Sequence, residues 1–114
     1  MIRLKNILSE EVVKDIDFVN NRMNGAAKIT QNAKEKGGDA LLTYHHFYVK
    51  LPYYQKSVDG ELDMQMVKEE YDNLLTDLYE ATRNSMNITQ IEFQELVGKI
   101  EVLGELLIRK GTDQ

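Results

Sequence analysis

Apolar side chains recur at every third or fourth position through most of this chain. That spacing places them along one side of an α-helix, because the helix turns once every 3.6 residues. The pattern is most regular at Val67, Tyr71, Leu74, Leu78 and Ala81. The sequence therefore predicts an all-α fold. The predicted helices cover residues 9–36, 39–54, 63–85 and 89–110.

The predicted helices have recognisable starts and stops. Asp63 is suited to cap the third helix, and Thr89 with Glu92 three residues later forms a capping box for the fourth. Glycine ends a helix readily, because it adopts the left-handed backbone conformation without strain. We therefore expect residues 37–38, both glycine, to end the first helix and Gly111 to end the last.

Two stretches are less typical of a helix. Residues 20–25 have low helix propensity, so a kink or break near Gly25 is an alternative to one continuous helix that begins at Ser9. Residues 44–49 are rich in side chains that also suit a strand. Pro52 lacks a backbone donor and collides with the carbonyl group four residues earlier, so the second helix should kink or end there.

The order of the helices predicts how they pack. A short connection joins the last two helices, which forces them to run antiparallel as a hairpin. The helix over 89–110 carries a wide apolar face that needs more than one neighbour. The other helices then complete an antiparallel bundle of three to four helices, within one chain or across a dimer. The 114 residues suit a single helical domain over 1–114.

Charge is unevenly distributed along the chain, whose formal net charge is −5. Residues 1–50 hold 8 basic and 6 acidic side chains, whereas residues 51–114 hold 6 basic and 13 acidic ones. The acidic half would repel a polyanion, so binding to nucleic acid is disfavoured. Opposite charge favours packing of the two halves on each other, or contact between subunits.

The chain has no cysteine, which excludes a disulfide, a thiolate nucleophile and a cysteine-ligated metal. Its apolar runs are shorter than a secretory leader or the ~20 residues of a membrane span. We therefore expect a cytoplasmic protein without membrane contact.

Metal chemistry has weak support in the residue pattern. A ferritin-like di-iron site needs Glu-x-x-His pairs, but Leu42 and Thr43 stand three residues before the two histidines. The acidic residues of the last two helices lie mostly off the apolar stripes, as on a solvated face. Gly60 fits the glycine of a calcium-binding loop, but Gln55 and Met66 replace its anchoring carboxylates. We expect no bound metal, no cofactor and no catalytic residue.

An aromatic cluster is the most distinctive feature of the chain. Five aromatic side chains and two adjacent histidines fall within eleven residues, and tyrosine is enriched at the centres of protein interfaces. We predict an interaction surface formed by Tyr44, His45, His46, Phe47, Tyr48, Tyr53 and Tyr54. Core packing of the second helix is the main alternative, and a small-ligand pocket is a further one. The sequence favours two surface imidazoles at the histidines.

The first ten residues, Met-Ile-Arg-Leu-Lys-Asn-Ile-Leu-Ser-Glu, resemble the opening residues of many small proteins of marine tailed bacteriophages. The resemblance implies a phage origin and carries no functional position. The sequence as a whole favours a small helical binding, adaptor or assembly protein without catalytic activity, which acts on itself or on another protein. The alternatives are a ferritin-like or other metal-dependent bundle enzyme, and an acidic decoy of a nucleic-acid-binding protein.

Overall fold

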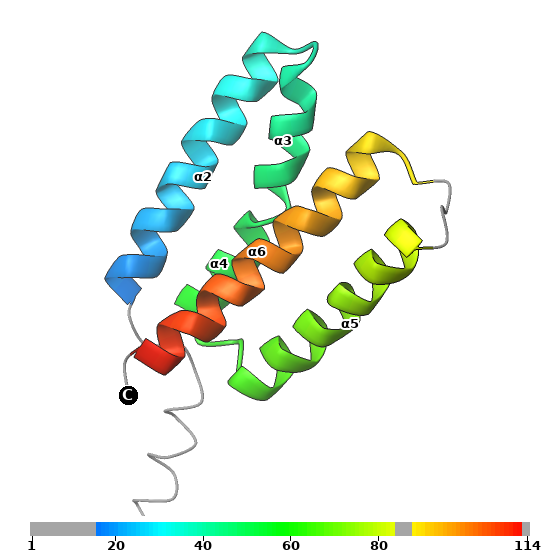
Figure 1. The fold of residues 1–114 in the computed structure, drawn as a ribbon. Coiled ribbons are helices and arrows are strands. Elements are labelled where there is room, and N and C mark those ends of the chain that lie inside the picture. Colours follow the sequence, from blue (N-terminus) through cyan, green and yellow to red (C-terminus); the bar gives the residue numbers. More distant parts are fainter. Residues whose placement is uncertain (1–15, 84–87, 113–114) are drawn as a thin grey trace, which may run out of the picture.

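The computed structural model describes residues 16–83 and 88–112, in which the regular elements are helices (Figure 1). They are α2 (Ile16–Lys36), α3 (Ala40–Tyr48), α4 (Leu51–Val58), α5 (Met64–Arg83) and α6 (Gln90–Thr112). The predicted all-α fold is confirmed. The predicted helix start at Ser9 and the predicted break at residues 84–87 lie outside the described residues.

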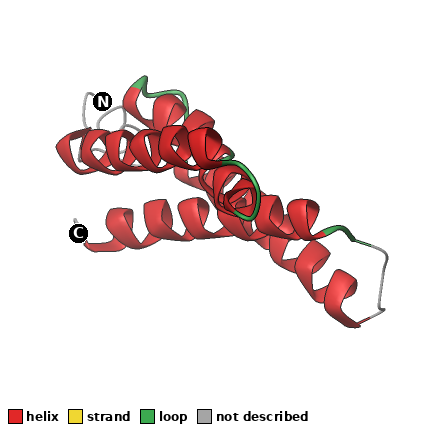
Figure 2. Cartoon of the chain, turned by 90° about the horizontal axis from the view of Figure 1, so that it is seen from above, coloured by secondary structure: helices red, strands yellow, loops and turns green. Residues whose placement is uncertain are grey.

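The helices form an open row. α2 and α3 form a hairpin, α3 lies against α6, and α6 runs antiparallel to α5 (Figure 1). α4 continues the path of α3 and packs mainly against α2. Seen from above, the long helices cross rather than share one axis (Figure 2). α5 therefore stands at one end of the row and has α6 as its main neighbour.

The predicted caps are confirmed. Asp63 accepts a hydrogen bond from the backbone N–H of Met66 at 2.8 Å, which begins α5. Thr89 and Glu92 form the capping box, and each accepts the backbone N–H of the other at 3.0 Å. Residues 37–38 end α2 with φ angles of 66° and 56°, a backbone conformation that glycine tolerates.

The prediction of one continuous helix over 39–54 is wrong, because the structure has two helices there and the second ends later. The helix is interrupted after Tyr48, and the second part, α4, continues to Val58. Pro52 lies in the first turn of α4, where the missing N–H has no intrahelical partner to lose. The proline thus ends one helix and begins the next, and residues 44–48 are helix rather than strand.

The predicted first helix is continuous through Gly25, because α2 runs across this residue without a break. The predicted end of the last helix is wrong, since α6 continues past Gly111 to Thr112. Glycine has a low helix propensity but does not stop a helix whose flanking turns are held by packing or capping. Tertiary contacts by Val19 and Ala26, both buried, hold α2 on either side of its weak stretch.

The core lies where α2, α4 and α6 meet the start of α5. Its buried side chains are Val19, Ala26, Tyr54, Leu62, Met64, Val67, Val102, Leu103 and Leu106. Full burial of a large apolar side chain stabilises a fold by about 1.5–3 kcal/mol. The second half of α5 contributes little to this core, because Ala81 is its one buried residue among those described.

Candidate functional site

A row of polar contacts joins α3 and α4 to α6, and we call it the polar seam. Lys50 donates a hydrogen bond to Glu101 Oε1 at 2.8 Å, and His46 Nε2 lies 2.9 Å from the same oxygen. Tyr54 donates a hydrogen bond to Glu105 at 2.5 Å. Residues 46, 50 and 54 follow one another at four-residue intervals, which keeps all three on the side that faces α6.

Both histidines take part in the polar seam. His45 Nδ1 lies 2.9 Å from Glu95, and His46 Nδ1 lies 3.1 Å from Gln94 Oε1. The exposed fractions of the two side chains are 26% and 14%. The prediction of two surface imidazoles is therefore wrong, because α6 lies close enough to bind both rings.

Lys50 is the most deeply buried cation described, with an exposed fraction of 5%. Its ammonium group lies 4.6 Å from the centre of the Phe47 ring and pairs with Glu101. Burial of Glu101 opposes its ionisation, but the hydrogen bonds from Lys50 and His46 outweigh burial and lower the pKa of this carboxyl group. A buried ammonium group without such a partner would be strongly destabilising.

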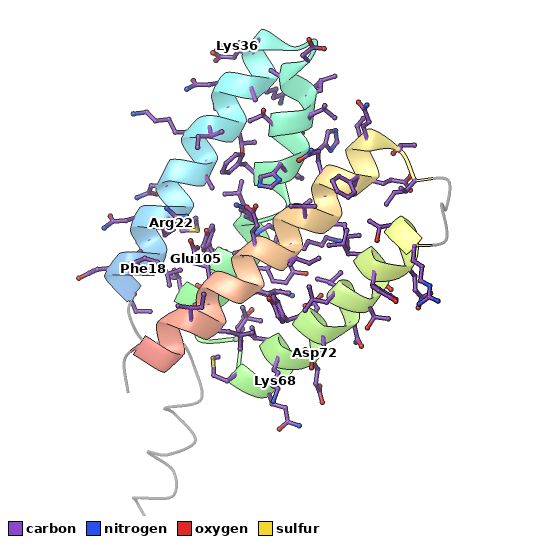
Figure 3. All side chains as sticks on the ribbon, in the orientation of Figure 1. Phe18, Arg22, Lys36, Lys68, Asp72 and Glu105 are labelled. Atoms are coloured by element: carbon purple, nitrogen blue, oxygen red, sulfur yellow. The ribbon has the colours of Figure 1, made fainter. Side chains whose placement is uncertain are left out.

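The polar seam extends to α2 through Arg22. Its guanidinium group lies 2.6 Å from Glu105, and the two side chains point toward each other (Figure 3). The hydrogen bond to Glu105 raises the pKa of Arg22. Burial, and then the hydrogen bond to Glu105, raise the pKa of Tyr54 well above its ordinary value. Basic groups from the first half of the chain thus pair with acidic groups of the second half.

Gly98 lies at the closest approach of α6 to α3. A Cβ atom at this position would overlap the backbone carbonyl oxygen of His46, and it would lie 2.8 Å from a methyl carbon of Val49. No residue with a side chain fits here without a shift of the backbone. Gly98 therefore sets the short distance that lets both histidines reach α6.

The predicted interaction surface is divided between the core and the exterior. Tyr54 is 2% exposed, and Phe47 packs against the core cluster. Tyr53 donates a hydrogen bond to Glu70 of α5 at 2.8 Å. Tyr44 and Tyr48 stack with their ring centres 5.2 Å apart, and Tyr48 is 50% exposed. The remaining two of the seven residues, His45 and His46, belong to the polar seam. The seven residues therefore do not form one surface.

The acidic partners of the polar seam were missed by the sequence analysis. Glu95, Glu101 and Glu105 were expected on a solvated face, but they bind groups on α2, α3 and α4. A signal was present, since the spacing of four residues between Glu101 and Glu105 matches that between Lys50 and Tyr54. This matching spacing could not identify the partners, because many pairs of helix faces in the sequence share a spacing of four residues.

Within residues 16–83 and 88–112, no three histidine or acidic side chains come together in a group that could hold a metal ion. None of the described helices is both long enough and apolar enough to cross a membrane. No protein-family model, curated protein or solved structure matches this chain.

Proposed function

We propose that this protein is a small helical assembly or adaptor protein that binds a second copy of itself through the outer face of α5. We define that face by Leu75 and Tyr79, with Leu74 and Leu78 beside them. One observation carries the proposal: α5 has an apolar stripe of about four turns but packs mainly against a single helix, α6.

The burial of α5 supports this assignment. Leu74 and Leu78 belong to the most regular apolar stripe of the sequence, yet both remain half-buried. Leu75 and Tyr79 are 38% and 57% exposed. These two residues are four positions apart, so they lie on one side of the helix. An apolar strip of this kind marks a contact surface when it is continuous.

A helix of 20 residues is about 30 Å long and can lie along the same helix of a second copy. Two copies related by a twofold axis would use the same face, which is the commonest symmetry of small oligomers. Covering the exposed parts of Leu75 and Tyr79 would contribute a fraction of the about 1.5–3 kcal/mol that full burial of a large apolar side chain provides.

The test is the molar mass in solution, measured by light scattering on a sizing column. We expect a mass well above the 13.2 kDa of one chain. The double variant Leu75→Glu, Tyr79→Glu should lower it to that of the monomer, because it places charge at the contact. Circular dichroism should show unchanged helix content, since both positions are exposed.

Two matched variants sharpen the test. Met66→Glu alters a 52% exposed residue of α5 on another side of the helix and should leave the mass unchanged. Tyr48→Glu places charge on the exposed tyrosine of α3, within the surface predicted from sequence. Loss of association with Tyr48→Glu but not with the α5 variant would contradict the proposal, and so would a monomeric wild-type protein.

A further inference from the structure

Two opposite charges flank the apolar pair on the outer face of α5. Asp72 precedes Leu75 by three residues. Arg83 follows Tyr79 by four residues. These spacings place the four side chains on one side of the helix, and all four are exposed. Asp72 and Arg83 are eleven residues apart, which is close to three helical turns, so they also lie on the same flank of that face.

Both charges are available to a partner. The guanidinium group of Arg83 donates a hydrogen bond to the Tyr79 hydroxyl at 2.5 Å and lies 5.7 Å from the centre of its ring. This contact holds Arg83 along the outer face. Among the described residues, neither Arg83 nor Asp72 forms an ion pair. The side chains of Lys68 and Asp72 project from α5 on the side away from α6 (Figure 3).

We propose that the second copy lies antiparallel to the first along α5, so that Asp72 of each copy pairs with Arg83 of the other. This inference rests on the proposed function, and it adds the orientation of the partner and the residues that select it.

One register satisfies the apolar and the charged contacts together. In an antiparallel pair centred at residue 77, Leu75 of each copy faces Tyr79 of the other. Asp72 and Arg83 lie five and six residues from that centre, so each comes level with the other within about 1.5 Å. A twofold axis perpendicular to the helices keeps the charged flanks on the same side. Both ion pairs therefore form at once.

A parallel pair lacks this match. Residues 72 and 83 of the two copies would then lie about 16 Å apart along the helix axis, which is too far for an ion pair. Lys68 is exposed and stands seven residues before Leu75, so it would lie level with the same lysine of the second copy. Like charges across a contact oppose association. The charges of α5 therefore favour the antiparallel pair.

Exchange of the two charges tests the orientation, with the dissociation constant of the dimer measured by analytical ultracentrifugation at low salt. Asp72→Arg and Arg83→Asp each replace two attractive pairs by two repulsive ones, so each should weaken association about 10-fold. The double variant Asp72→Arg, Arg83→Asp restores opposite charges and should recover most of the wild-type affinity. High salt should reduce all these differences, because it screens exposed charges.

Asp77→Arg is the matched control. It makes the same change of charge as Asp72→Arg at an exposed position of α5 that lies about 140° further around the helix. The dissociation constant of this variant should stay close to that of the wild type. Circular dichroism should show unchanged helix content in every variant, since the substituted positions are exposed.

Unchanged affinity in both single variants would overturn the antiparallel arrangement, and so would a double variant as weak as the single ones. If Leu75→Glu, Tyr79→Glu still abolishes association in that case, the outer face of α5 is the contact and only the orientation is wrong. A monomeric wild-type protein would overturn the orientation and the proposed function together.

Discussion

The two sides of α6 are covered in different ways. Toward α3 the contact is polar and close, with Gly98 against the backbone of His46 and paired charges along the polar seam. Toward α5 the contact is apolar and loose, and Leu74 and Leu78 remain half-buried. Hydrogen bonds require defined distances and angles, whereas apolar burial does not. The α3 side therefore fixes how the helices are placed, and the α5 side leaves surface for a partner.

The largest expected effect on stability is at Gly98, where the α3 side of α6 makes its close contact. Gly98→Ala should destabilise the fold by about 3 kcal/mol, because its methyl group overlaps backbone that cannot rotate away. Urea unfolding followed by circular dichroism measures the change. A stability equal to that of the wild type would mean that α3 and α6 separate easily. The contact of α6 with α3 would then be no closer in effect than its contact with α5.

The next effect concerns the charges of the polar seam. Glu101→Gln should destabilise the fold by about 2 kcal/mol at pH 7, because Lys50 stays buried without its carboxylate. The further substitution Lys50→Met should recover part of this loss, since a buried apolar side chain needs no partner. Urea unfolding of the single and double variants measures both changes. If the double variant is less stable than Glu101→Gln, Lys50 stabilises the seam through other contacts.

The pH dependence of this variant follows from the lowered pKa of Glu101. A carboxyl group with a lowered pKa in the folded state contributes stability above its ordinary pKa and loses it as pH falls through the folded value. The stability difference between wild type and Glu101→Gln should therefore shrink below about pH 4. Unfolding curves between pH 3 and pH 7 would show the convergence, and a constant difference would contradict the ion pair.

The smallest effect on stability is expected on the side of α6 that faces α5. In Gly104→Ala the new methyl group lies 3.2 Å from the ring of Tyr71, which is only half-buried and can shift. The gain in helix propensity should offset this contact, so we expect a change within about 0.5 kcal/mol. Urea unfolding measures it beside Gly98→Ala, and a loss similar to that variant would show that both sides of α6 are tight.

Gly25→Ala is the matched control for both glycine variants. No atom lies within 4 Å of its added methyl group, so propensity alone acts there. We expect this variant to gain about 0.5–1 kcal/mol in urea unfolding.

The functional surface was less predictable than the helices. The aromatic cluster predicted an interface because tyrosine is frequent at interfaces, but its consecutive members lie one to five residues apart on α3 and α4 and therefore point in several directions. Tyr54 enters the core and Tyr48 remains exposed. The sequence gives no measure of which neighbour each helix face meets, so composition alone could not separate these roles.

The sequence by itself determined the helices and most of their ends. Helix periodicity and caps are local, because they depend on residues within one or two turns, and the box of Thr89 and Glu92 is an example. Only the tertiary structure decided which faces meet. It placed Gly98 against His46, gave Lys50 its carboxylate and left Tyr79 exposed. These outcomes depend on the relative position of residues about fifty apart in the chain, which local spacing does not encode.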